Sequence, residues 1–373
     1  MKSVKIFFLF LTVVVFSCTK LDETFRAELE ENNSGTITAA ELLTSAYNSI
    51  GGTYVTGNTW HIQEHTSDES IAPTRGPDWY DNGQWQGLHA HTWGTDNGII
   101  VGAFSDLLSA QFAASNVLQF SPSAQQAAEA RFIRALSIFS VADGWDQVPY
   151  RENLTDYRID PTTMTGTQAA DFVISELTAI MNDLPSTGAA YVANKNAARA
   201  LLMKTYLNKG VFANRASPSF DDGDLSQVIS LANDIIASGQ YSLETNYFDN
   251  FAPNNDAVST ENIYTFYNQN GDRGQNMRGT WFQIAHYNMD PGGWNGFATL
   301  SDFYDKFDAN DKRIGAYYTY PGSRPNPGHR TNVGFLIGQQ YNLTTDVALN
   351  DRAGNPLAGP RGRSLRRRGG VTQ

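Results

Sequence analysis

Apolar residues recur at helical spacing in several separate segments between residues 38 and 240. The first helix is expected to begin at Thr38 and to end at Gly51-Gly52, because paired glycines disfavour a helix. Ser, Asn and Asp side chains can accept hydrogen bonds from the free N–H groups of a first helical turn. On this basis the expected N-caps are Ser121 (followed by Pro122), Asn194 and Asp224. The later helices are expected over about 99–120, 122–143, 168–184, 194–206 and 224–238.

These segments mix small and large apolar residues, which lets neighbouring helices approach closely. The pattern predicts an all-α dominated fold of tetratricopeptide-like stacked helical hairpins. The strict 34-residue consensus of such repeats is not visible. The periodicity therefore leaves an irregular helical domain equally open.

Two regions lack this periodicity. Residues 53–98 contain many Gly, Asn, Asp and Pro residues together with four tryptophans, and they predict a long functional loop. Residues 241–358 are rich in Asn, Asp, Gly, Tyr and Trp and predict a large irregular lobe, with a short strand over 262–267.

The composition is 41% hydrophobic and 17% charged, which is typical of a folded domain. The net charge is −11, but five of the 27 basic residues fall within the last 13 positions. The remaining chain has 22 basic and 38 acidic residues. An excess of negative charge of this size argues against nucleic acid as a partner.

The N-terminus has the pattern of a lipoprotein signal peptide. Lys2 and Lys5 precede an apolar run over residues 6–16, which is too short for a typical membrane span. The run leads to Ser17-Cys18, a loose lipobox that contains the single cysteine of the chain. We expect cleavage after residue 17 and lipidation of Cys18; an ordinary secretory signal with an incidental cysteine is the alternative. No later segment is expected to span a bilayer.

One segment combines an Ala-Arg-Phe-x-Arg-Ala-Leu helix with a Gly-x-x-x-Val-Pro turn, at residues 130–136 and 144–149. It is the most specific of several segments that resemble the SusD/RagB family of surface nutrient-binding lipoproteins of the Bacteroidetes. The acidic residues just after Cys18 also resemble a surface-export signal. The other similar segments are residues 66–69, 73–83, 89–93 and 196–207.

The resemblance implies a surface protein of the outer membrane, lipid-anchored and facing the cell exterior. Such a protein binds an oligosaccharide without hydrolysing it and delivers it to a SusC-like TonB-dependent transporter. It also implies tetratricopeptide-like repeats and an irregular lobe that contributes much of the ligand site. Its ligand can be a glycan or, as in RagB-type proteins, a peptide.

The C-terminal region departs from the family pattern. Family members usually run well beyond this length and end in further helices, whereas here the character changes after residue 358 to an arginine-rich tail. We expect a truncated or frame-shifted end; a genuine basic tail is the alternative. The expected divisions are a signal peptide (1–17), a lipidated tether (18–38), a helical region (39–240), an incomplete irregular lobe (241–358) and an atypical tail (359–373).

A sugar site needs a flat aromatic ring for the C–H face and polar groups for the hydroxyls. We predict Trp93 as the aromatic platform, with Asp68, Arg75 and Asp96 as polar contacts. Each tryptophan has an alternative role as a loop anchor packed into the core. The further candidates are Trp79 and Trp85 in the first loop region, and Trp281, Tyr287 and Trp294 in the second.

One motif suggests different chemistry. His61, Glu64 and His65 fit H-x-x-E-H, in which two histidines could bind zinc beside a glutamate base. The flanking residues show no clear helical periodicity, and no third ligand can be chosen. We therefore expect hydrogen-bonded or solvated loop histidines, no metal and no cofactor.

Two other functions compete with glycan capture. A glycoside hydrolase needs a pair of carboxylates, which 38 acidic residues always allow but no motif selects. A tethered solute-binding protein of an ABC importer would alternate strands and helices. Residues 100–240 lack intervening strands, which disfavours that class.

Lipidation predicts that Cys18→Ala yields an unacylated protein that leaves the membrane fraction. Mass spectrometry of the intact protein and membrane fractionation provide the measurements. An unchanged mass and unchanged fractionation in the variant would reject Cys18 as the anchor.

Overall fold

In this computed structural model the described residues are 37–55, 57–74, 76–151, 154, 156, 158–269, 282–289, 292–320 and 327–359. Cys18, Arg75, Trp281 and the basic tail beyond residue 359 lie outside these ranges. Predictions that concern them remain predictions.

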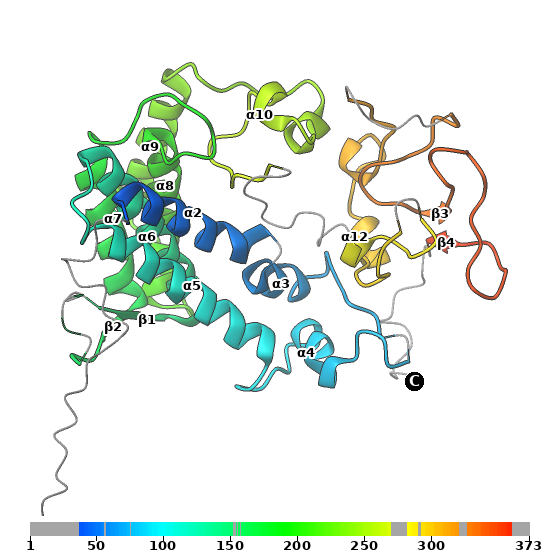
Figure 1. The fold of residues 1–373 in the computed structure, drawn as a ribbon, viewed down its shortest axis with the longest axis horizontal. Coiled ribbons are helices and arrows are strands. Elements are labelled where there is room, and N and C mark those ends of the chain that lie inside the picture. Colours follow the sequence, from blue (N-terminus) through cyan, green and yellow to red (C-terminus); the bar gives the residue numbers. More distant parts are fainter. Residues whose placement is uncertain are drawn as a thin grey trace, which may run out of the picture. The chain divides into compact units, whose positions relative to one another are not determined.

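Long helices that pack in chain order form the main body of the described structure (Figure 1). Each helix contacts the next one along the chain, from α2 through α5, α6, α7 and α8 to α9. The predicted all-α fold of stacked helical hairpins is confirmed. These helices are α2 (Ala39–Val55), α5 (Gly98–Val117), α6 (Ala124–Trp145), α7 (Gly166–Ile180), α8 (Lys195–Ala213) and α9 (Asp222–Ala237).

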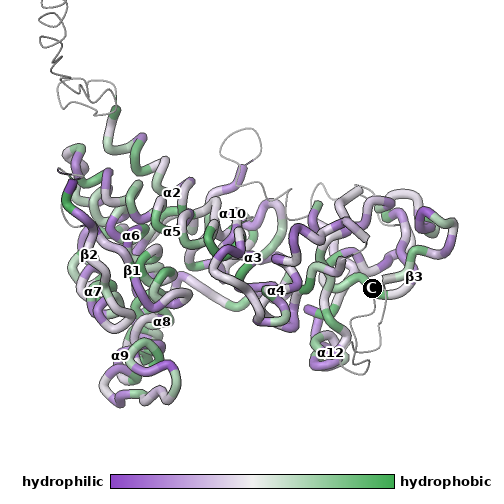
Figure 2. Tube along the Cα trace, turned by 90° about the horizontal axis from the view of Figure 1, so that it is seen from below, coloured by the Kyte–Doolittle hydropathy of each residue, from purple (hydrophilic) through white to green (hydrophobic). Residues whose placement is uncertain are grey.

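Helix α6 is the centre of the hydrophobic core. It contacts α2, α5, α7 and α8, and half of its 22 residues are buried. Apolar and polar segments alternate along the helices (Figure 2). Buried alanines such as Ala130 and Ala135 allow close approach, while Phe132 and Ile133 fill the space between helices.

Side-chain caps fix where the helices begin. Asn194 caps α8 as predicted, accepting from Asn196 N and Ala197 N. The predicted caps Ser121 and Asp224 are wrong, because Ser123 forms a capping box with Gln126 and the caps of α9 come from Asp221. Helix α2 also continues through Gly51-Gly52, because packing of the buried Gly51 outweighs the low helix propensity of glycine.

The predicted loop 53–98 contains ordered helical elements. These are α3 (Asn58–His65), η3 (Asp81–Gly83) and α4 (Gln84–Ala90). Helix α3 buries Thr59, His61 and His65 instead of aliphatic residues. Its buried face therefore produces no periodic pattern of apolar residues in the sequence. The expectation that residues 53–98 are irregular throughout is therefore wrong.

The described residues between 241 and 358 have few regular elements, as expected for the loop-rich lobe. The strand expected over 262–267 is absent; Tyr264 and Phe266 instead pack their rings against Phe132 and Tyr54, at centroid distances of 5.0 and 5.5 Å. The regular elements of the lobe are η4 (Tyr247–Phe251), α10 (Asn255–Val258), α12 (Ser301–Tyr304), η5 (Lys312–Ile314) and the antiparallel pair β3 (Gly338–Gln339) and β4 (Ala358–Gly359). A second antiparallel pair, β1 (Gln147–Tyr150) and β2 (Thr162–Thr165), follows α6, so the expectation that residues 100–240 lack strands is wrong.

Helix α5 bears on the expectation that no later segment spans a bilayer. Among the described residues, its length and composition would allow it to cross a bilayer. It packs between α2 and α6, however, and Ala103, Leu107, Ala110 and Ala114 are fully buried there. Its place in the helical core accounts for its apolar composition.

The burial of α6 predicts that Ile133→Ala destabilises the fold by about 2–5 kcal/mol, because it leaves a cavity among packed helices. The matched control is Ile236→Ala on α9, where the side chain is 76% exposed. The control should change the free energy of unfolding by less than about 0.5 kcal/mol. Urea denaturation measures both, and equal losses would contradict the assignment of α6 to the core.

Candidate functional site

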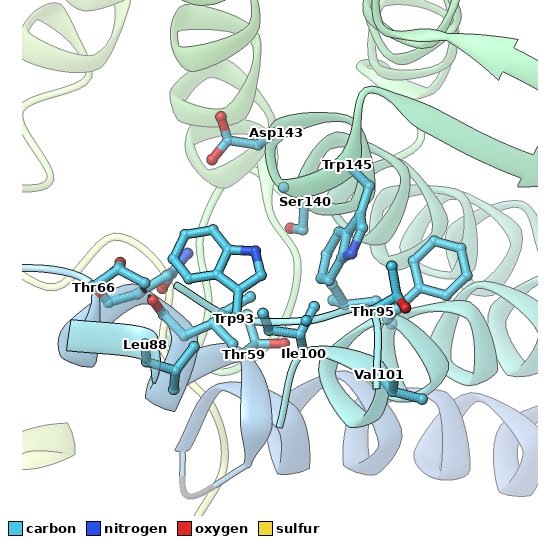
Figure 3. Close-up of a pocket in the computed structure, with 16 residues that line it drawn as sticks. Thr59, Thr66, Leu88, Trp93, Thr95, Ile100, Val101, Ser140, Asp143 and Trp145 are labelled. Atoms are coloured by element: carbon cyan, nitrogen blue, oxygen red, sulfur yellow. Dashed lines mark hydrogen bonds between the residues drawn. The ribbon is translucent and has the colours of Figure 1, made fainter. Parts of the chain in front are cut away.

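A cavity of about 670 Å³ lies among α3, α5, the loop before α5 and the C-terminal end of α6 (Figure 3). This volume falls within the range typical of small-molecule sites. Its floor is apolar, with Leu88, Ile100, Phe104 and Leu107. The polar lining residues are Thr59, Gln63, Thr66, Thr95, Ser140 and Asp143.

Trp93 is the predicted site residue that lines this cavity. The residue is 44% exposed, so part of its indole surface is accessible to a ligand. The loop around it is fixed by local hydrogen bonds. Thr92 N donates to Gly87 O at 2.9 Å, and the ring of His91 lies 2.8 Å from Thr66 O through Nε2.

Trp145 forms a second aromatic wall of the cavity, from the last residue of α6 (Figure 3). Its ring packs against Phe104 at a centroid distance of 5.3 Å, which holds its position. Trp145 lies within the family-like segment 144–149 but was not among the predicted ligand residues. Its position after Gly144, at the end of a predicted helix, was the sequence feature that could have indicated it.

Trp79 and Trp85 lie in an aromatic cluster outside the cavity. Trp85 is 7% exposed and donates from Nε1 to Asp81 Oδ2 at 2.7 Å. The Trp79 ring lies 5.7 Å from Trp85 and 5.0 Å from Phe297, and its Nε1 donates to Trp294 O at 3.3 Å. These contacts give both residues the anchor role that was the alternative for each loop tryptophan.

Glycine is required beneath Trp79. A Cβ atom at position 296 would lie 2.5 Å from Trp79 Cζ2, so a larger residue would displace the ring. Trp79 itself has a left-handed backbone with φ of 59°, which is uncommon for a bulky residue. Together with the backbone pairing of Ile71 and Ala298, this packing joins the first loop region to residues 294–298.

Those remaining predicted residues that the structure describes do not line the cavity. Asp68 pairs with Lys306 Nζ at 3.9 Å, and Asp96 is exposed with its carboxylate folded over Gly94. Tyr287 packs under the guanidinium of Arg352, 4.4 Å from its ring centroid. Trp294 is 58% exposed and stacks on Phe282 at 5.7 Å, so it presents a separate aromatic surface.

His61 and His65 of the H-x-x-E-H motif are buried in the aromatic cluster. Their rings lie 5.7 Å apart, and the His65 ring is 4.2 Å from Phe297. His61 Nδ1 and both His65 ring nitrogens are buried from solvent. The expectation of solvated loop histidines is therefore wrong, because both residues lie on α3 and their rings pack into the apolar cluster. In the described ranges no group of three or more His, Cys, Asp or Glu side chains has a metal-binding arrangement.

Burial lowers the pKa of both histidines to about 4, and for His65 the nearby His61 and His89 contribute in the same direction. The neutral imidazoles therefore fit the cluster, whereas their protonated forms do not. Glu64 shows the converse effect, since burial and then Glu69 raise its pKa to about 6.

No protein-family model matches the chain. In sequence it is similar to the starch-binding protein SusD of Bacteroides thetaiotaomicron, with 27% identity over 165 residues. That match covers 43% of this chain and 28% of SusD.

The fold is similar to several solved structures. Surface glycan-binding protein A of B. thetaiotaomicron in complex with laminarihexaose has a TM-score of 0.59 and 19% identity, over 74% of this chain and 61% of that one. A structure with xylogluco-oligosaccharide has a TM-score of 0.61 and 17% identity, over 79% and 61% of the two chains. A SusD superfamily protein of B. thetaiotaomicron has a TM-score of 0.58 and 18% identity, over 76% and 65%. This chain thus spans less than two thirds of each of these relatives.

The buried histidines predict a stability that falls with acidification. Their pKa values are lower in the folded than in the unfolded protein, so the unfolded state binds more protons below pH 6.5. Stability should be independent of these groups above pH 6.5 and should fall between pH 6.5 and 4. The full loss is about 3 kcal/mol for each histidine.

Denaturation measured across this pH range, on the unmodified chain and on His65→Phe, tests the effect. The variant should lose part of the pH dependence, while His329→Gln at an exposed histidine should retain it. An identical pH profile in His65→Phe and in the unmodified chain would reject the assignment.

Proposed function

The sequence match to SusD and the shared fold support membership of the SusD/RagB family, and from that premise we propose that the chain captures an oligosaccharide. The observation on which this rests is the partly exposed indole of Trp93 in a cavity bordered by hydroxyl, amide and carboxylate groups.

The geometry suits the chemistry of a sugar. A pyranose has apolar C–H faces and a rim of hydroxyl groups, so it can stack on an indole while its rim forms hydrogen bonds. Thr66, Thr95 and Asp143 border the cavity near the two tryptophans (Figure 3). In this proposal Trp93 is the platform and Trp145 limits the space beside it. The polar side chains of Thr66, Thr95 and Asp143 form hydrogen bonds with the sugar hydroxyls.

The relatives favour an oligosaccharide as the ligand class. The names of the similar proteins specify starch, laminarihexaose and a xylogluco-oligosaccharide. These glycans differ in linkage, so they suggest the class and not a particular polymer. Wet, open sites bind reversibly, which suits a protein that passes its ligand onward.

The cellular setting completes the proposal. A lipid on Cys18 would tether the chain to the outer membrane, facing the exterior, with residues 18–38 as the tether. A SusC-like TonB-dependent transporter would receive the oligosaccharide, and the binding protein itself would leave the glycan intact. The lipobox and the family resemblance of residues 130–149 support these steps.

Trp93→Ala should weaken binding of an oligosaccharide by about 1–3 kcal/mol, because it removes one stacking surface. The exposed ring adds little to the core, so the melting temperature should stay nearly constant. Calorimetric titration against a panel of plant, host and microbial polysaccharides, with a thermal melt of each protein, provides both measurements.

Trp294→Ala is the matched control, since Trp294 is similarly exposed but does not line the cavity. It should retain full affinity. Loss of binding in Trp294→Ala with full affinity in Trp93→Ala would move the site to the irregular lobe.

A further inference from the structure

A second cavity, of about 460 Å³, lies between α2, the N-terminal part of α6 and residues 191–192. It shares no lining residue with the Trp93 cavity. Its lining is polar, with hydroxyl and amide groups from Thr44, Ser123 and Gln126. Glu129 also lines it and has an unusual environment.

Glu129 is a buried carboxylate bound by neutral donors. Glu129 is only 6% exposed. The Tyr47 hydroxyl donates to Oε2 at 2.7 Å, and Gln125 Nε2 donates to Oε1 at 2.8 Å. A carboxylate has about four acceptor positions, so further donors can still bind.

The groups around Glu129 do not neutralise its charge. Burial, together with Tyr264 and Glu129, raises the pKa of Tyr47, and burial followed by Glu129 raises the pKa of Tyr264. Both tyrosines therefore keep their protons, and the buried Tyr264 hydroxyl has no hydrogen-bond partner in the described structure.

The nearest arginines of α6 are engaged elsewhere. Arg131 pairs with Glu176 at 2.8 Å, and Arg134 pairs with the same carboxylate. Within the described residues Glu129 forms no ion pair with a lysine or arginine. A buried carboxylate without a counter-charge is energetically costly, which favours a ligand that brings a positive charge.

We propose that this second cavity binds a primary ammonium group, which forms an ion pair with Glu129. The ammonium group supplies up to three donors for the free acceptor positions of the carboxylate, and charge-assisted hydrogen bonds are stronger than neutral ones. The rings of Tyr47 and Tyr191, which also line the cavity, provide aromatic faces for the cation. The ligand class is a small amine, either an amino sugar or an alkylamine.

Calorimetric titrations of the full chain with glucosamine hydrochloride and with glucose compare a charged and a neutral ligand of nearly equal shape. Glucosamine should bind at least tenfold more tightly than glucose. Glu129→Gln keeps the side-chain shape but removes the charge, and it should reduce glucosamine affinity at least tenfold. Ile236→Ala, which changes an exposed side chain outside both cavities, should leave glucosamine affinity unchanged.

Two further measurements keep the test decisive. Affinity of the unmodified chain for glucosamine should fall as NaCl rises from about 0.02 M to about 0.5 M, because salt screens an ion pair. n-Butylammonium chloride distinguishes the ligand sources: binding equal to that of glucosamine indicates an alkylamine site, and weaker binding indicates an amino-sugar site. Absence of glucosamine binding, equal affinity for glucose, or full glucosamine affinity in Glu129→Gln would each overturn the proposal.

Discussion

The burial of α6 on several sides is the constraint on which the described structure depends. Because α2, α5, α7 and α8 all pack against it, small changes in its position would disturb four interfaces at once. The paired arginines Arg131 and Arg134 add a partly buried ion-pair group with Glu176 of α7, which fixes how the two helices align. A buried ion pair of this kind specifies geometry more than it adds stability.

The same helix also positions both cavities. Glu129 lies near its N-terminal end and Trp145 at its C-terminal end, 16 residues further along. At 1.5 Å per residue, the two positions are roughly 24 Å apart along the helix axis. This core helix thus contributes to two chemically different cavities, one with an aromatic wall and one with a buried carboxylate.

Burial also separates the aromatic residues into two groups. Trp85, Phe297, His61 and His65 form a packed cluster that joins α3 and α4 to the chain around residue 297. Trp93 and Trp294 remain open to solvent. The packed group holds the loops in place, and this fixed backbone allows an exposed indole to be presented without a large loss of conformational freedom on binding.

The sequence by itself determined the all-α class, the approximate extent of the long helices, the irregular lobe and the Asn194 cap, because these depend on local periodicity and local hydrogen bonds. It also selected Trp93. It did not predict α3, whose buried face consists of Thr59, His61 and His65, because such residues give no apolar period. It did not show that Trp85 is buried, and it did not indicate the position of Trp145 or the environment of Glu129. Those properties arise from contacts between residues far apart in the chain, and only the tertiary structure decides which side chain is covered and which remains open.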